Sequence, residues 1–171
     1  MAERTGIVTA GGNPITLVGE EVKVGDRAPD VTVLDNDMKE TRLSEFDGKV
    51  RVIASVPSLD TAVCDMETRR FNMEAGTLGD DVEILTISMD LPFAQKRWCG
   101  AAGVENVKTF SDHREGAFGK AYGVLMKELR LLARAVFVVD REGVIRYVEM
   151  VDDTGNEPDY EAALSAVEEL T

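Results

Sequence analysis

Short apolar runs alternate with helix-like segments through the middle of this chain, and this alternation restricts the possible folds more than any other feature. The runs at 50–56 and 82–89 have the length and the β-branched content of buried strands. Helices are expected after them, over about 62–75 and 92–102. Strands that alternate with helices are typical of an α/β fold built on a central sheet.

Later segments indicate that this sheet is mixed. Apolar runs at 135–139 and 144–151 flank Asp140-Arg141-Glu142-Gly143, a hairpin signature that implies antiparallel pairing. Three further elements are expected: a short strand at 107–110, a helix-like stretch at 117–122 and a final helix that Pro158 opens and that runs to Leu170.

The residues ahead of the first long strand predict a small N-terminal hairpin. Residues 15–24 alternate apolar and polar residues around a Gly-Glu-Glu turn, and 31–34 is another short strand candidate. A length of 171 residues suits one domain, and 44% hydrophobic residues can fill its core. We therefore expect a single domain over 1–171, with a β-hairpin at about 15–24 before the mixed α/β sheet and its flanking helices.

The charge balance excludes several classes of partner. Lys and Arg total 19 against 32 Asp and Glu, a net charge of −13. Binding to nucleic acid or to anionic lipid needs clustered cations, so neither is expected. Apolar runs such as 135–139 are too short to span a membrane, and the first residues lack a basic segment followed by an apolar one. We expect a cytoplasmic protein.

Two cysteines, Cys64 and Cys99, are the residues most able to carry chemistry. Their spacing makes neither a CxxC pair nor a four-ligand zinc set, and the single histidine, His113, cannot complete one. If they have a chemical role, they act as thiols.

Cys64 is placed at a turn from a strand to a helix. Pro57 ends the strand because it has no N–H to give to a sheet, and Thr61 is a candidate N-cap whose hydroxyl can accept from the amide of Cys64. The first turn of a helix carries free N–H groups and the positive end of the helix dipole, and both favour thiolate over thiol. Such turns are also where α/β folds place ligand chemistry.

The helix alone stabilises a thiolate only in part, so a guanidinium from elsewhere in the fold is needed as well. Arg69 and Arg70 are close in sequence. Arg134 is the more informative candidate, because it directly precedes the strand expected at 135–139 and can lie at a sheet edge.

These residues resemble a known family. Pro57, Thr61 and Cys64 fit the pattern P-x-x-x-T-x-x-C of the peroxiredoxins, and Pro57 to Cys64 together with Thr68-Arg69-Arg70-Phe71 looks like the bacterial thiol peroxidase branch of the atypical 2-Cys type. Four further segments resemble that branch in the same order: Ser111-Asp112-His113-Arg114, Phe118 to Gly123, Leu131 to Ala135 and Glu157 to Tyr160. The similarity covers nearly the whole chain from the hairpin onward.

The resemblance implies a thioredoxin-like fold with an N-terminal hairpin, and a peroxidase that uses cysteine and no metal or organic cofactor. Cys64 matches the nucleophile that attacks a hydroperoxide, and Thr61 matches the hydroxyl that bonds thiolate and peroxide. Pro57 matches the residue that shields the pocket, and Arg134 matches the activating guanidinium.

The resemblance also implies how such an enzyme is recycled. Cys99 matches the resolving cysteine, which would trap the Cys64 sulfenic acid as a disulfide that thioredoxin reduces. A homodimer is implied in the same way. Since a disulfide needs Cα atoms within about 4.4–6.8 Å and the two cysteines are expected on different helices, we expect both segments to unwind locally on oxidation. Trp98, next to Cys99, would then report the change by its fluorescence.

Three residues depart from what this site would favour. Ala62 stands where the branch usually has Pro, and this can leave the turn looser. Asp65 and Glu67 are acidic beside a thiolate that needs positive charge.

Other functions remain open from the residues alone. His113 could serve a cysteine hydrolase, but its polar setting favours an exposed or structural histidine. A thiol–disulfide oxidoreductase normally carries CxxC, which is absent here. A non-catalytic thioredoxin-like interaction module, with both cysteines inert, is the third alternative.

Overall fold

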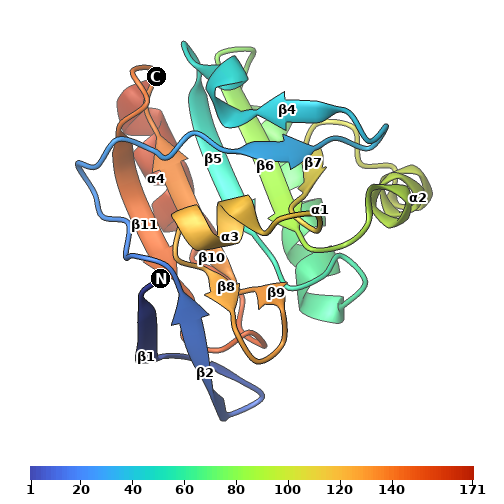
Figure 1. Cartoon of the computed structure of the whole chain (residues 1–171). Coiled ribbons are helices and arrows are strands. Elements are labelled where there is room, and N and C mark those ends of the chain that lie inside the picture. The colour runs from blue at the N-terminus through green and yellow to red at the C-terminus, as the bar shows by residue number, and fades with distance from the viewer.

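The computed structural model describes every residue from Met1 to Thr171 and arranges the strands in two sheets (Figure 1). The larger sheet has seven strands in the order β11-β10-β5-β6-β7-β3-β4, and the smaller has four in the order β1-β2-β8-β9. The large sheet contains β3 (Thr32–Leu34), β4 (Glu40–Arg42), β5 (Val50–Ser55), β6 (Val82–Ser88), β7 (Lys108–Ser111), β10 (Ala135–Val139) and β11 (Ile145–Met150). The small one contains β1 (Glu3–Ala10), β2 (Asn13–Val18), β8 (Leu125–Met126) and β9 (Leu131–Leu132).

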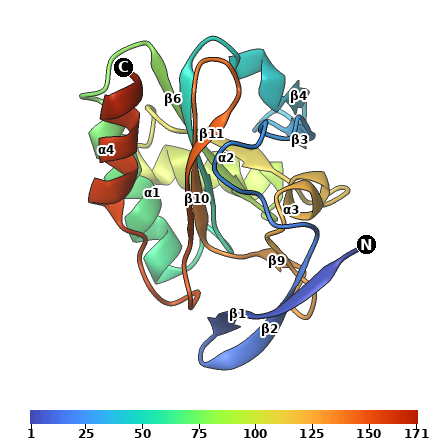
Figure 2. The same ribbon diagram turned by 90° about the vertical axis from the view of Figure 1, so that its left-hand side faces the viewer.

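Helices cover both faces of the large sheet. Figure 2 shows α1 and α4 together on one side of it, with α3 and the β1–β2 hairpin on the other. The helices are η1 (Leu43–Phe46), α1 (Ala62–Ala75), α2 (Pro92–Ala102), α3 (Ala117–Ala121) and α4 (Tyr160–Leu170). None of them combines the length and the apolar character needed to cross a membrane.

Strand alternation divides the core between these two faces. In β10, Val136 and Val138 join the cluster under α1 and α4, whereas Phe137 and Val139 join the larger cluster on the α3 side. This is the period of two that a strand imposes. Because β10 is buried on both faces, its sequence is a continuous apolar run rather than an alternating one.

The predicted α/β architecture is confirmed. Strands β5, β6 and β7 run parallel, while β10 pairs antiparallel with both β5 and β11. The helices expected at 62–75 and 92–102 begin and end where the sequence placed them. The final helix begins at Tyr160 rather than Pro158, with the Asp159 carboxylate accepting from the amide of Ala162.

The hairpin predicted at 15–24 is wrong in its register. Residues 15–18 are the second strand of a hairpin whose first strand is β1, and Ala10 faces Asn13 across a two-residue turn. Gly11 and Gly12 form this turn with φ values of +58° and +83°, a conformation that favours glycine. The Gly-Glu-Glu segment does not return along β2, because Gly19 lies against the backbone of Lys120 and Gly123 instead.

The register of β10 positions a charged residue at the end of β5. Ala135 faces Ser55, the last residue of β5, and β10 runs in the opposite direction. Arg134, one residue before β10, therefore lies beside the point where the chain leaves β5 for α1. The Ser55 hydroxyl donates to the carbonyl of Ala133 (2.7 Å) and fixes this junction.

Candidate active site

Cys64 lies in the first turn of α1 and is fully buried. Its side chain packs in a small apolar cluster with Val56 and Leu59, against which Trp98 of α2 also rests. The connection from β5 is short, so the end of this strand and the start of α1 are held close together. Cys64 is a free thiol.

Arg134 is the polar partner of the Cys64 sulfur. Its Nη2 atom lies 3.3 Å from Sγ, and the arginine side chain is only 1% exposed. Nη2 and Nε also donate to the carbonyl of Thr154, at 2.7 and 3.2 Å. A positive charge held this far from water acts strongly on a neighbouring sulfur, because little solvent screens it.

The loop that carries Thr154 is bound to the N-terminal hairpin. The amide of Thr154 donates to Thr9 O (3.0 Å), and the amide of Thr9 donates to Asp152 O (2.8 Å). The Asp153 carboxylate accepts from the Thr9 hydroxyl (2.6 Å) and the Gly12 amide (3.0 Å). These bonds, led by that from Thr9, lower the pKa of Asp153 to about 2. The hairpin thus helps to hold the carbonyl that orients Arg134.

Glu67 is a second acidic group on the same guanidinium. Its Oε1 lies 3.4 Å from Arg134 Nη1, its side chain is fully buried, and Oε2 has no hydrogen-bond partner. Burial raises the pKa of Glu67 to about 7, although Arg134 acts in the opposite direction. The sequence led us to expect only that Glu67 would disfavour a thiolate. In the structure its carboxyl group contacts Arg134 directly.

The charged residues next to Cys64 in sequence do not reach its sulfur. Asp65 accepts from Arg69 Nε (2.9 Å) and from the indole Nε1 of Trp98 (2.8 Å). Arg70 pairs with Glu74 and lies over the ring of Tyr160. Of the three arginines considered from sequence, the structure therefore places only Arg134 against the thiol.

Thr61 precedes α1 as its N-cap residue, but its predicted capping bond is absent. The hydroxyl instead donates to the carbonyl of Ser58 (3.0 Å) within the turn, so no side chain occupies the first-turn amides of α1. Thr61 and Ala62 are exposed, whereas Pro57 is buried where the chain leaves β5. The first-turn N–H groups are thus left for an incoming ligand.

Asp90 anchors the turn between β5 and α1, a role that was not expected from the sequence. Its carboxylate accepts from the Ser58 hydroxyl (2.7 Å), the Leu59 amide (2.8 Å) and the Ser88 hydroxyl (2.7 Å). The only signal available was its position just after β6, since the ends of parallel strands meet at one edge of the sheet.

Cys99 lies in the second half of α2 and is half-buried. Its sulfur is 3.4 Å from the hydroxyl of Thr109 in β7, which in turn donates to Asn36. Both cysteines are free, on two different helices. Trp98 connects them, because it precedes Cys99 and packs against the Cys64 cluster.

A surface cavity of about 360 Å³ opens beside the thiol turn. Leu59, Thr61, Ala62 and Trp98 are among the residues that line it. An adjoining cavity of about 290 Å³ shares Leu59 and Trp98 and extends to Asp90 and Arg97. A small substrate can approach the start of α1 from this side.

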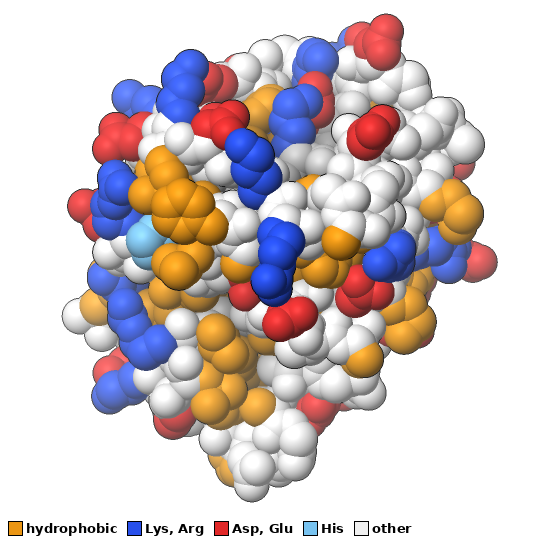
Figure 3. All heavy atoms as spheres, turned by 90° about the vertical axis from the view of Figure 1, so that its right-hand side faces the viewer, with side chains coloured by type: hydrophobic (Ala, Val, Ile, Leu, Met, Phe, Trp, Pro, Cys, Tyr) orange, Lys and Arg blue, Asp and Glu red, His pale blue; other side chains and the backbone are white.

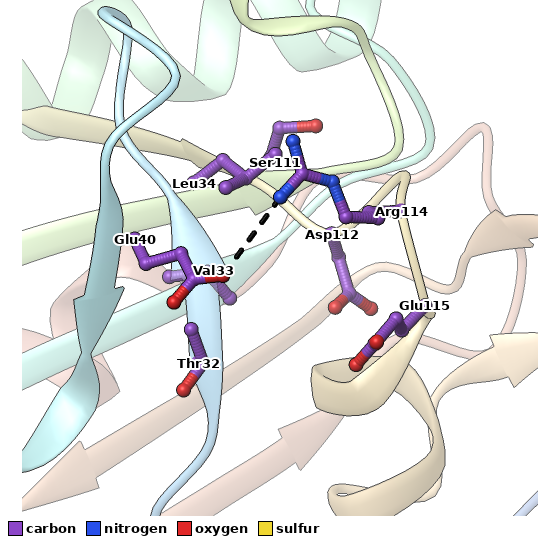
Figure 4. A pocket seen from close by; sticks show the side chains of 8 residues that line it. All are labelled: Thr32, Val33, Leu34, Glu40, Ser111, Asp112, Arg114 and Glu115. Carbon is purple, nitrogen blue, oxygen red and sulfur yellow. Dashed lines mark ion pairs between the residues drawn. The ribbon is translucent and has the colours of Figure 1, made fainter.

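A separate hollow of about 190 Å³ lies between β3 and the loop after β7 (Figure 4). Asp112 points into it, yet its carboxylate is already bound by the amides of Phe118 and Gly119 at the start of α3. Arg114 and Glu40 form an ion pair of 3.8 Å above it. This cavity contains no thiol, and Asp112 serves to hold α3.

His113 is not a partner of Cys64. It is half-buried in the same loop as Asp112, and its Nε2 atom has no hydrogen-bond partner. The sulfur of Cys64 contacts Arg134 instead. The pairing of thiol and imidazole that a cysteine hydrolase needs is therefore absent.

Comparison with known proteins indicates the family of this chain. The Redoxin family model matches residues 23–164. A thiol peroxidase of Halalkalibacterium halodurans is 60% identical over 93% of this chain and 95% of its own length, and a thiol peroxidase of Bacillus subtilis is 56% identical over 95% and 97%. A solved structure of a peroxiredoxin-like protein from Aquifex aeolicus superposes with a TM-score of 0.91 at 45% identity, and 98% of each chain is covered.

Proposed function

Because this chain belongs to the Redoxin family and, within it, to the thiol peroxidase branch of the peroxiredoxins, we propose that it reduces hydrogen peroxide and alkyl hydroperoxides through the thiolate of Cys64. The thioredoxin-like fold and the peroxidase class follow from the relatives. The substrates, the intermediates and the reductant are the parts proposed.

The first step joins the Cys64 sulfur to the terminal oxygen of the peroxide. The sulfur becomes sulfenic acid, the O–O bond breaks, and an alkoxide or hydroxide leaves. Arg134 and the first-turn amides of α1 donate toward the charge that develops on the oxygens. The single observation that carries the proposal is the buried contact of 3.3 Å between Arg134 Nη2 and Cys64 Sγ.

Thr61 and Pro57 complete the proposed pocket. The Thr61 hydroxyl lies on the exposed side of the turn, and when a peroxide enters it can turn from Ser58 O to the substrate. Pro57 is buried at the end of β5, where it shields the sulfur from water.

Cys99 is proposed to resolve the sulfenic acid. Its thiol attacks the Cys64 sulfur, water leaves, and a Cys64–Cys99 disulfide forms. The cysteines lie on α1 and α2, so we propose that the first turn of α1 and the later part of α2 unwind to let them meet. A dithiol protein of the thioredoxin type then reduces the disulfide by exchange.

The two alternative functions are less well supported. A disulfide oxidoreductase would use a pair of neighbouring thiols, whereas Cys64 is followed by Asp65, Met66 and Glu67. A non-catalytic module would have no need of a buried guanidinium on a free thiol. Relatives named thiol peroxidase at 60% and 56% identity favour the peroxidase over both.

The proposal is tested by peroxide consumption with a thioredoxin system, in wild type and in Cys64→Ser and Cys99→Ser. We expect Cys64→Ser to abolish turnover. Cys99→Ser should oxidise once per chain and then stop, because no intramolecular disulfide forms. Turnover by Cys64→Ser would overturn the proposal, and disulfide reduction by wild type without peroxide would favour the oxidoreductase.

We propose in addition that the protein works as a homodimer in the cytoplasm. Leu91 and Phe93, at the start of α2, are 51% and 67% exposed, and Figure 3 shows hydrophobic side chains gathered in patches on the side of the molecule where α2 lies. A second copy covering this surface would remove it from water. Analytical ultracentrifugation of wild type and Phe93→Glu tests this, with a shift to monomer expected for the variant.

A further inference from the structure

Two acidic side chains share one buried guanidinium. Arg134 contacts Cys64 Sγ through Nη2 and Glu67 Oε1 through Nη1. Cys64 and Glu67 are 0% exposed and Arg134 is 1% exposed. If both acids were ionised, two negative charges would be buried beside one positive charge. One buried guanidinium cannot compensate two buried negative charges, so a second negative charge beside Arg134 is unfavourable.

The remaining charged groups near Glu67 make a second negative charge still less favourable. Glu149 of β11 and Glu157 before α4 both raise the pKa of Glu67, and Arg134 is the cation that lowers it. Tyr160 of α4 also lies near Glu67. Burial, together with nearby groups that include Glu67, raises the pKa of Tyr160, so this tyrosine is a neutral neighbour. The Oε2 atom of Glu67 is buried and has no hydrogen-bond donor. Burial without a donor costs a neutral carboxylic acid less free energy than it costs a carboxylate.

We propose that Cys64 and Glu67 share a single negative charge across Arg134, so that Glu67 holds a proton while Cys64 is a thiolate and releases it when Cys64 becomes sulfenic acid. Glu67 is then a positioning residue that keeps the guanidinium free to act on the sulfur and the peroxide. This inference rests on the proposed function, since it concerns the oxidation of Cys64.

The exchange balances in atoms, electrons and charge. The thiolate sulfur forms a bond to the terminal peroxide oxygen, which keeps its hydrogen, and the sulfur gives up two electrons. The O–O bond breaks, the departing alkoxide takes up one proton from solvent, and Glu67 releases one proton. The buried site begins with a thiolate and a carboxylic acid and ends with a sulfenic acid and a carboxylate.

Infrared difference spectroscopy tests this directly. The Cys99→Ser variant, reduced and then given one equivalent of hydrogen peroxide at mildly acidic pH, keeps the sulfenic acid because no resolving thiol is present. We expect a carboxylic acid C=O band to disappear and a carboxylate band to appear. The matched variant Glu67→Gln/Cys99→Ser should show neither change, whereas Glu168→Gln/Cys99→Ser, altered at an exposed position of α4, should show both.

The outcomes separate this inference from the proposed function. Mass spectrometry on the same sample counts the oxygen added to Cys64. Oxygen uptake without loss of the carboxylic acid band would overturn the shared charge and leave the peroxidase intact, whereas no oxygen uptake would overturn the peroxidase. Isotopically labelled glutamate assigns the band to a glutamate, and Glu67 is the only glutamate that is buried. The test therefore survives if Glu67→Gln does not fold.

A proton count provides a second readout. In weakly buffered solution with a pH indicator, the Cys99→Ser protein should take up no net proton per Cys64 oxidised. Glu67→Gln/Cys99→Ser, with its Cys64 shown to be thiolate by ultraviolet absorbance, should take up one, because no carboxylic acid supplies it. Equal uptake by both proteins would contradict the proposal, and a merely structural Glu67 predicts that equality.

Discussion

Arg134 Nη2 lies 3.3 Å from the sulfur of Cys64, although 70 positions separate the two residues in the chain. The contact arises because β10 runs antiparallel to β5, with Ala135 facing Ser55, while α1 begins soon after β5 ends. One residue before β10 and one in the first turn of α1 therefore meet at the same edge of the sheet.

Replacing Arg134 should slow the oxidation of Cys64 more than it disturbs the fold. Arg134→Gln removes the positive charge at the sulfur, and we expect a loss of about 100-fold or more in the rate with hydrogen peroxide, the scale found when one preorganised donor is removed. Stopped-flow measurement of that rate checks this. Arg141→Gln, at an exposed ion pair with Asp81, is the matched control and should react like wild type. A near-normal rate for Arg134→Gln would contradict the role given to the guanidinium.

The hydroxyl of Thr61, rather than its bulk, should matter for peroxide reduction. Thr61→Ser keeps a donor at the turn, whereas Thr61→Val keeps the shape and loses both the bond to Ser58 O and any bond to substrate. We expect a small effect for Ser and a loss of at least about tenfold in kcat/KM for Val, roughly the value of one hydrogen bond. Equal activity of the two variants would show that the hydroxyl is not used.

The hairpin contact should affect activity from a distance. Thr9→Val removes the hydroxyl that donates to Asp153 (2.6 Å) and loosens the loop that carries Thr154. We expect a several-fold slower oxidation of Cys64, since misplacement of a supporting group lowers the rate of a preorganised site. Thr5→Val is the control, because Thr5 is exposed on the same strand. If both variants react at the wild-type rate, the hairpin does not orient Arg134.

This contact should persist in acid. The pKa of Asp153 is lowered from 3.8 to about 2, so the folded protein favours the carboxylate. Its stabilising effect is therefore present above the ordinary pKa and is lost as the pH falls through about 2. The rate of proteolysis of the hairpin as a function of pH measures this stabilisation. Near neutral pH, Asp153→Asn should be cleaved faster than wild type.

Glu67 should make the protein less stable as the pH rises. Its pKa is raised from 4.5 to about 7, so between these values the folded state binds more protons than the unfolded state, and the free energy of unfolding falls as the pH increases. The shift corresponds to a loss of about 3 kcal/mol across that window. Urea unfolding from acid to neutral pH should show this fall in wild type but not in Glu67→Gln. Glu168→Gln, exposed on α4, should behave like wild type.

Trp98 should report formation of the disulfide. Its indole donates to Asp65 (2.8 Å) and packs on the Cys64 cluster, so movement of either cysteine segment changes its surroundings. Adding peroxide to wild type should change its fluorescence, and a dithiol should reverse the change. Cys99→Ser should lack the reversible phase. A signal identical in both proteins would mean that the disulfide leaves α2 in place.

Local sequence patterns were sufficient to predict much of the fold. The apolar runs and the helical segments between 50 and 102 predicted strands and helices within one residue of those observed. The buried strands are mostly apolar runs, and the two helices have Thr61 and Pro92 at their starts and Gly76 and Gly103 at their ends. The first strand was missed, since β1 is mostly exposed and contains Gly6 with φ +74° at an irregularity in its pairing. As a consequence, β2 was predicted to pair with the residues that follow it rather than with β1, which precedes it.

The candidate site was predictable where it depends on strand order and not where it depends on backbone carbonyls. Cys64 in the first turn of α1 and Arg134 directly before β10 follow from the positions of the elements. The group that orients Arg134 is the backbone carbonyl of Thr154, which the residue type at that position cannot reveal. The hydrogen bonds from the turn to Asp90 depend on how two loops pack against each other. Thr61 has the residue type of a capping residue, but the turn from Ser58 captures its hydroxyl first.

Arg134 is held by the carbonyl of Thr154 in the loop after β11, whereas the sulfur that it contacts lies in the first turn of α1. If that turn unwinds to form the disulfide, nucleophile and guanidinium separate, and Glu67 leaves its place beside the arginine as well. An oxidised molecule would then not react with a second peroxide until a reductant restores the helix. The contact between Arg134 and Cys64 would be lost once in each cycle, and its loss would protect the sulfur from irreversible oxidation.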